Sequence, residues 1–179
     1  METVTFVDGF GRAVQVKKDG VVTSAAKGNS AKDENVMIVS GRNVYDAFGR
    51  VAKAFYPTTE GTGSKSTFNK SFDNVSPTVT VYDVLDRATS VTLPDNSTTT
   101  TAYTVDNGSH ALVTTVTDAL HNVQATHTNG SGKTLKTIQK SGPDGEITTS
   151  FEYDGIQRLV RVTDTEGNVM TSTYDMGEM

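Results

Sequence analysis

The sequence contains no cysteine and no tryptophan among its 179 residues. The lack of cysteine excludes a disulfide framework and thiolate chemistry, and it leaves the redox compartment open. Hydrophobic residues make up 35% and aromatic residues 7%, both low shares for a globular protein. Thr, Ser, Val and Gly take their place, and this composition suits two-faced sheets and tight turns better than helices. We therefore expect an all-β protein.

Charge and hydropathy exclude two classes of partner. The formal net charge of -5 is spread along the chain without a basic stripe, so we expect no nucleic-acid partner. No apolar run is long enough for a spanning helix, so we expect no membrane insertion by this segment. The opening METVTFVDGF has no positive segment followed by an apolar core, and we expect no signal peptide.

A six-residue phrase recurs along the chain. It reads VDGFGR at 7–12, YDAFGR at 45–50, YDVLDR at 82–87 and YDGIQR at 153–158. Its Asp falls at near-even intervals, and on spacing alone we place Asp118, in TDALHN, in the same series. A second Tyr returns at a shorter distance in two copies, at Tyr103 and Tyr174. The chain is therefore predicted to repeat one small structural unit.

The segments around the phrases alternate in side-chain type with a period of two, as in ITTSFEYD at 147–154. Turn-forming words separate these segments: TEGN at 165–168, PDNS at 94–97, KKDG at 17–20 and GPDG at 142–145. The order of strand, turn, strand, turn predicts antiparallel hairpins. Hairpins of this size are marginal alone, so they must stack on neighbours.

The residue types in the phrase suit a hairpin end. Asp can accept a hydrogen bond from the backbone two residues on. Three residues after the Asp, Gly11 and Gly49 allow a left-handed backbone, and Asp86 and Gln157 replace them in the other copies. The Arg can reach back to the Asp and lay its guanidinium over the Tyr ring of the phrase. We predict a structural role in the turns for Asp8, Gly11, Arg12, Tyr45, Asp46, Gly49, Arg50, Tyr82, Asp83, Arg87, Tyr153, Asp154, Arg158, Tyr174 and Asp175.

The phrase YDxxGR, followed by a strand, a PDG-like turn and another YD, resembles the YD repeat of bacterial RHS proteins over residues 77–175. FVDGFGRAVQVKKDG and VSGRNVYDAFGRVAKAFYPTTE resemble the segment that leads into the RHS repeats in B components of insecticidal toxin complexes and in SpvB-type proteins. We therefore expect two parts. Residues 1–76 form a degenerate hairpin segment, with a flexible loop near 57–77, and residues 77–179 form YD/RHS repeats.

The resemblance implies a fold and a role. RHS proteins wind their hairpins into a spiral strip that closes into a hollow shell, and in toxin complexes the shell holds a cytotoxic C-terminal polypeptide. The expected fold is a strip of stacked antiparallel hairpins, a fragment of such a shell. The implied partners are the rest of the shell, the encapsulated C-terminal toxin polypeptide and other toxin-complex subunits. Self-association through strand edges is also expected, and the resemblance implies a secreted or cell-surface bacterial protein.

No catalytic residue, cofactor or metal site is predicted. The family's self-cleavage site lies around a DPxGL phrase, and YDMGEM at 174–179 lacks its Pro and Leu. NGSGKT at 129–134 lacks the first Gly of a phosphate loop, and His121 and His127 would lie six residues apart on a strand, too far to share one metal. A YD-repeat adhesin or carbohydrate-binding module remains the alternative to a shell. Both strand faces mix Thr with aliphatic residues, so the sequence does not indicate which face is interior.

Overall fold

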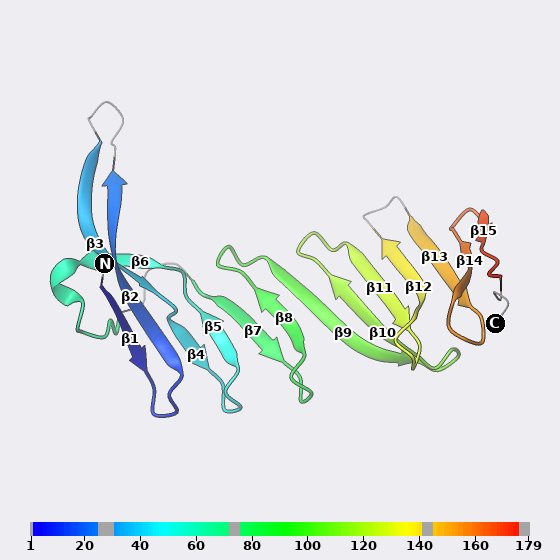
Figure 1. Ribbon diagram of the computed structural model, residues 1–179, viewed down its shortest axis with the longest axis horizontal. Coiled ribbons are helices and arrows are strands. Elements are labelled where there is room, and N and C mark those ends of the chain that lie inside the picture. Colours follow the sequence, from blue (N-terminus) through cyan, green and yellow to red (C-terminus); the bar gives the residue numbers. More distant parts are fainter. Residues whose placement is uncertain (1, 25–30, 72–75, 141–144, 176–179) are drawn as a thin grey trace. The chain divides into compact units, whose positions relative to one another are not determined.

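The structure is a computed structural model that describes residues 2–24, 31–71, 76–140 and 145–175. Within these residues the chain forms antiparallel strands and one 3-10 helix, so the expectation of an all-β fold is confirmed (Figure 1). The strands are β1 (Thr3–Val7), β2 (Ala13–Ser24), β3 (Lys32–Ser40), β4 (Asn43–Tyr45), β5 (Val51–Ala54), β6 (Thr58–Gly61), β7 (Thr78–Tyr82), β8 (Ala88–Thr92), β9 (Thr98–Asp106), β10 (Ala111–Thr117), β11 (Val123–Thr128), β12 (Thr134–Lys140), β13 (Glu146–Tyr153), β14 (Leu159–Thr163) and β15 (Val169–Thr171). The helix η1 spans Thr62–Ser64.

The chain divides into two compact units. The first contains Met1–Tyr82 with Val91–Ser97, and the second contains Asp83–Ser90 with Thr98–Met179. The boundary passes through β8.

The first unit holds a four-stranded antiparallel sheet in the order β1-β2-β3-β6. One face of this sheet carries Lys17, Met37 and Val39, whose side chains are fully buried. The segment after β6 covers that face, since Phe68 packs edge-on against Phe6 of β1 with ring centroids 5.5 Å apart. The same unit contains β4, β5 and β7, which pair in that order.

The prediction of a turn at KKDG is wrong, because residues 17–20 lie inside β2. Gly20 has no positive φ. It faces Ile38 of β3, and a Cβ at Gly20 would lie 2.5 Å from Ile38 Cδ1. Glycine is needed here so that Ile38 can pack over the strand, and not because the chain turns. Of the GPDG word, only Gly145 lies within the described residues, and its φ of 99° is left-handed.

The expectation of a loop near 57–77 is wrong in part. Thr58–Gly61 form β6, which pairs antiparallel with β3, and η1 follows. Buried polar side chains of the sheet hold the backbone of the segment after β6: Lys17 donates hydrogen bonds to the Ser64 and Thr67 carbonyls, and Gln15 donates one to the Asn69 carbonyl. A polar composition alone therefore does not distinguish a segment that is bonded to a sheet from a flexible loop.

The second unit is a meander in which each strand from β9 to β15 pairs antiparallel with the next (Figure 1). Its turns therefore alternate between the two ends of the strands. Ala111 pairs with Asp106 at one end of the β9–β10 pair, whereas Thr117 pairs with Thr100 at the other end. Asp118 follows Thr117 and opens a turn with the same hydrogen bonds as Asp154, but this turn lies at the opposite strand ends. Spacing therefore identified the turn and not its side of the meander, because turns of the same chemistry occur at both ends of the strands.

The buried hydrophobic core is thin. Among the described residues it consists of Val36, Met37 and Val39 in the first unit and Ala111, Val113 and Ala125 in the second. Most other strand residues of the second unit are half-buried on both faces. Much of the stability must therefore come from the strand ladders and from contacts at the turns. In the part of the chain that the structure describes, no helix has the length and apolarity needed to cross a membrane.

Candidate functional site: the Asp-centred turns

The turn at Asp46 shows how the repeated phrase closes a hairpin. Asp46 Oδ1 accepts hydrogen bonds from the N–H groups of Phe48 and Arg50, both at 2.9 Å. Its Oδ2 accepts one from Arg50 Nε at 2.7 Å. The backbone adds two more, from Asp46 N to Arg50 O at 2.8 Å and from Gly49 N to Asp46 O at 3.0 Å. One side chain thus bonds both the backbone and the cation of its own loop.

The same geometry recurs at the other phrases. Asp8, Asp83 and Asp154 each accept a 2.7 Å bond from the Nε of the Arg four residues on, which is Arg12, Arg87 or Arg158. The position three residues after the Asp is always left-handed, with φ of 77° at Gly11 and 82° at Gly49. Asp86 and Gln157 adopt φ of 62° and 66° there. The turn imposes this left-handed backbone on Asp86 and Gln157, although residues other than glycine adopt it at a cost in free energy.

The turn carboxylates are held in their charged form. Burial raises the pKa of Asp46, but the backbone and side-chain bonds from Arg50, the Phe48 N–H and the Arg50 charge together outweigh it, and the pKa lies below its ordinary 3.8. The pKa of Asp154 is also lowered, first by the backbone N–H of Arg158 and then by its guanidinium. A carboxylate that is kept ionised by hydrogen bonds within its own turn is a poor general acid. Within the described residues, no group of three or more His, Asp or Glu side chains could hold a metal ion.

Each Arg of a phrase lies over the Tyr of the following hairpin, not over the Tyr of its own phrase as expected. The guanidinium carbon of Arg12 is 4.2 Å from the ring centre of Tyr45, and that of Arg50 is 4.7 Å from Tyr82. In the second unit the same contact joins Arg87 to Tyr103 at 4.0 Å and Arg158 to Tyr174 at 4.5 Å. These distances fit cation–π contacts.

The Tyr hydroxyl explains why the ring turns towards the preceding hairpin. It donates a hydrogen bond to the carbonyl of the residue directly after the preceding cation. The bonds are Tyr45 to Ala13 at 2.9 Å, Tyr82 to Val51 at 3.1 Å, Tyr103 to Ala88 at 3.4 Å, Tyr153 to Thr134 at 3.0 Å and Tyr174 to Leu159 at 2.8 Å. We call each cation, ring and carbonyl set a tyrosine clamp. The clamp joins neighbouring hairpins, whereas the Asp closes a single hairpin. Asp175 lies after β15, outside any strand.

The sequence pattern missed one member of this set. Asn129 takes the place of Asp, and its Oδ1 accepts hydrogen bonds from the N–H groups of Ser131 and Lys133. Gly132 is left-handed, with φ of 76°, and Lys133 Nζ lies 5.9 Å from the ring centre of Tyr153. NGSGK is therefore the same turn with Asn and Lys in place of Asp and Arg. An Asx residue followed four positions later by a cation was the signal that could have found it.

A second missed feature lies at the tips of the turns. The residue two positions after each Asp of the series is large and apolar, and its exposure lies between 67% and 87% in all five turns. These tip residues are Phe10, Phe48, Leu85, Leu120 and Ile156. Arg12 and Arg50 also contact the rings of Phe10 and Phe48, at 5.2 and 5.0 Å. Exposed apolar side chains on rigid turns can contact a partner surface.

The first unit contains a buried ion pair that no motif indicated. Lys17 is fully buried, and its Nζ donates to Glu60 Oε2 at 2.6 Å, Ser64 O at 2.9 Å and Thr67 O at 2.5 Å. Burial raises the pKa of Glu60, but the bonds from Lys17 and Ser64 and the Lys17 charge outweigh it and lower the pKa. All three protons of the ammonium group have acceptors, so this pair holds the segment after β6 in place.

Comparison with protein-family models and with curated proteins gives no match. Comparison with solved structures does, and three examples are TcdB2-TccC3-TEV (19% identity, TM-score 0.63), TcdB2-TccC3 (18%, 0.61) and TcdB2-TccC3 without hypervariable C-terminal region (18%, 0.60). In each, the match covers 90% of this chain and 9% of the solved chain. The chain thus spans a small part of the proteins that it matches. The resemblance to toxin-complex proteins is confirmed at the level of the fold.

Proposed function

We propose that the chain is a non-catalytic structural part of an RHS-type shell that encapsulates or displays a C-terminal toxin for delivery. The tyrosine clamps carry this proposal. The Asp, Arg and Tyr side chains of the phrases bind one another and the backbone, as Asp46, Arg50 and Tyr82 do. Groups used in this way attach neighbouring hairpins to one another and leave little for chemistry on a substrate.

The likeness to TcdB2-TccC3 supports the same proposal. One of those solved structures is TcdB2-TccC3 without hypervariable C-terminal region. By analogy, we propose that this chain belongs to a longer protein with a variable C-terminal cargo, and that its partners are the rest of the shell, the cargo polypeptide and other toxin-complex subunits. A secreted or cell-surface bacterial location follows from that role. We further propose that residues 1–76 lead into repeats that begin at residue 77.

The test is the full-length protein that contains this chain. We expect its gene to encode further YD copies and an unrelated C-terminal domain, and we expect electron microscopy to show a hollow particle. The C-terminal domain should resist added protease in the intact particle and be cleaved after urea opens it. A solid particle, or a C-terminal domain digested at once, would contradict the proposal. Specific binding of a sugar on a glycan array would instead support the adhesin.

A further inference from the structure

Two turns of the second unit contain the dipeptide Asn-Gly, at Asn107-Gly108 and at Asn129-Gly130. In this dipeptide the glycine nitrogen can attack the side-chain carbonyl carbon of the asparagine, because glycine has no Cβ to restrict its approach. The first dipeptide lies in the turn between β9 and β10, and the second lies in the turn between β11 and β12. The same reactive pair therefore occurs in two different local structures.

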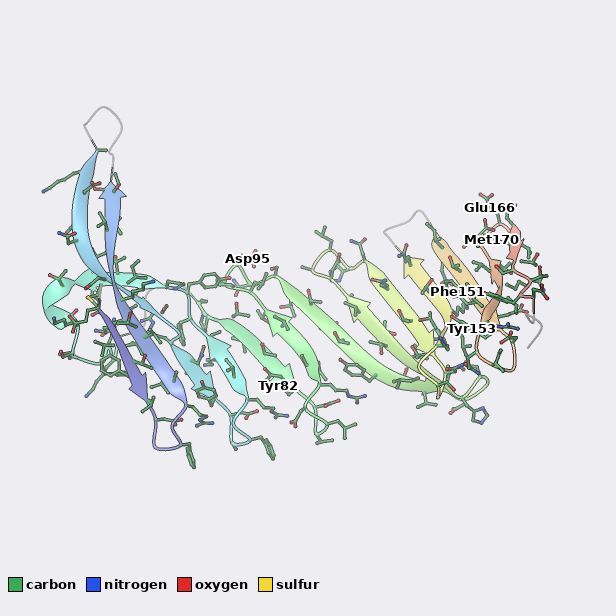
Figure 2. All side chains as sticks on the ribbon, in the orientation of Figure 1. Tyr82, Asp95, Phe151, Tyr153, Glu166 and Met170 are labelled. Atoms are coloured by element: carbon green, nitrogen blue, oxygen red, sulfur yellow. The ribbon has the colours of Figure 1, made fainter. Side chains whose placement is uncertain are left out.

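The Asn129 side chain is fixed by its turn. Its Oδ1 accepts hydrogen bonds from the N–H groups of Ser131 and Lys133, at 3.0 and 2.9 Å. Asn129 is half-buried, and Lys133 attaches the turn to the next hairpin, since its Nζ lies 5.9 Å from the ring centre of Tyr153, which Figure 2 labels. Ring closure onto the Gly130 nitrogen requires the amide to rotate away from both of its donors.

The Asn107 side chain is exposed, and its turn is closed by a different residue. Asp106 Oδ1 accepts a hydrogen bond from the Gly108 N–H at 3.2 Å, and its Oδ2 accepts one from the Ser109 N–H at 3.3 Å. Rotation of the Asn107 amide towards Gly108 breaks neither of these bonds. The Asp106 carboxylate also lies beside the nitrogen that must lose its proton in the attack.

We propose that Asn107 is a site of spontaneous deamidation, and that the turn protects Asn129 from the same reaction. The Gly108 nitrogen bonds to Cγ of Asn107 and gives up its proton, and the side-chain amide leaves as ammonia. Water then opens the succinimide ring at either carbonyl, which leaves aspartate or isoaspartate at position 107. One water is consumed and one ammonia is released, with no oxidant or reductant.

The two bonds to Asn129 set the expected difference between the sites. Breaking two hydrogen bonds before ring closure lowers the rate by roughly ten- to a hundredfold. The Asp-Gly dipeptides at Asp8-Gly9 and Asp154-Gly155 are held by the same pair of bonds to Oδ1. Their carboxylates are ionised at neutral pH, and an ionised carboxylate is a poor target for an attacking nitrogen. Among these turns, the reaction is therefore expected at Asn107.

The product differs from Asn107 in charge and in backbone length. The turn between β9 and β10 carries no Lys or Arg, so the new carboxylate lies beside Asp106 without an Arg or Lys of its own turn. Isoaspartate also adds a carbon to the backbone between Asp106 and Ala111, which pair directly. The added negative charge allows the deamidated chain to be separated by anion exchange.

The test follows both sites in the full chain during incubation at neutral pH in heavy-oxygen water. Chymotrypsin separates the sites, because cleavage after Tyr103 and Leu112 releases the first dipeptide and cleavage after Leu120 and Leu135 releases the second. Mass spectrometry measures the replacement of the amide by an acid that carries heavy oxygen, and isoaspartyl methyltransferase detects isoaspartate. A parallel sample in urea gives the two rates without the fold.

Gly108→Ala is the matched variant, since a Cβ there would lie 3.7 Å from Asp106 Oδ1, an ordinary contact. It should keep the β-sheet circular dichroism spectrum and slow the reaction at Asn107 several-fold, because the methyl group hinders the attack. Gly130→Ala is the control and should leave the rate at Asn107 unchanged.

We expect Asn107 to react roughly ten- to a hundredfold faster than Asn129 in the folded chain, and the two rates to become similar in urea. Equal rates in the folded chain, a faster reaction at Asn129, or the same ratio in urea as in the folded chain would each overturn the assignment.

Discussion

Replacing Lys17 with Met should destabilise the first unit strongly, because Lys17 is fully buried and its ammonium group makes three hydrogen bonds. Lys17→Met removes the Lys17 donor from the Ser64 and Thr67 carbonyls and from the Glu60 carboxylate, which keeps a hydrogen bond from Ser64 Oγ. Removing one partner of a buried ion pair costs about 3–5 kcal/mol. The Glu60 side chain keeps 16% exposure, so water recovers part of that cost. We therefore expect a loss of about 3 kcal/mol in the free energy of unfolding.

The assay is urea and thermal unfolding followed by circular dichroism. A loss of about 3 kcal/mol corresponds to a fall of roughly 6–12 °C in Tm for a chain of this size. Lys18→Met is the matched control, since Lys18 is the next residue of β2 and its side chain is exposed; it should change stability by less than about 0.5 kcal/mol. Glu60→Gln combined with Lys17→Met should cost less than the sum of the two single changes. Equal losses from Lys17→Met and Lys18→Met would refute the reasoning.

Four further predictions follow from the turns and the strand edges. Tyr153→Phe removes the hydroxyl that binds the Thr134 carbonyl at 3.0 Å and should cost about 0.5–1.5 kcal/mol in urea unfolding, whereas Tyr56→Phe should be neutral. Gln157→Gly relieves a left-handed φ of 66° and should stabilise by about 0.5–1 kcal/mol, whereas Gln124→Gly, inside β11, should destabilise; a loss of stability at both sites would contradict the strain argument. The turn carboxylates have pKa values below 3.8 in the folded state, so their stabilisation is present above that value and is lost as the pH falls through the lower folded values. The urea midpoint should therefore be nearly flat from about pH 7 to 5 and fall below about pH 4, and a rise on acidification would show that the carboxylates do not stabilise the fold. Finally, exposed strand edges should make the isolated chain associate as its concentration rises, and light scattering that shows a strict monomer throughout would argue against this.

The sequence predicted the turn chemistry better than the contacts between turns. Asp46 and Gly49 could be assigned because their roles are local: a carboxylate reaches its own loop, and a left-handed residue follows three positions later. The sequence predicted the wrong Tyr as the partner of Arg50. The true partner, Tyr82, lies in the next hairpin, and the orientation of its ring depends on a hydrogen bond from its hydroxyl to the Val51 carbonyl. Such a bond has no local signature.

The first unit shows a further limit of sequence patterns. KKDG reads as a turn because Asp-Gly commonly forms one, yet Lys17 is fully buried in β2 and Gly20 accommodates Ile38. The deciding contacts come from Glu60, Ser64 and Thr67, which lie more than forty residues away in the chain. The two faces of the β9–β15 sheet could not be told apart from the sequence for the same kind of reason. Its charged strand residues are seen to share one face only once the strand pairing is known.

The direction of the tyrosine clamps has a consequence for how such proteins change in length. Tyr174 binds the hairpin whose turn ends at Arg158, and Tyr82 binds the hairpin whose turn ends at Arg50. A hairpin such as β4–β5 brings both the Tyr that attaches it to the preceding hairpin and the Arg that contacts the next Tyr, whereas the turn between β9 and β10 carries no Lys or Arg. Duplication of a hairpin of the first kind repeats an existing junction, so such a hairpin can be added without a change in the contacts at the neighbouring junctions.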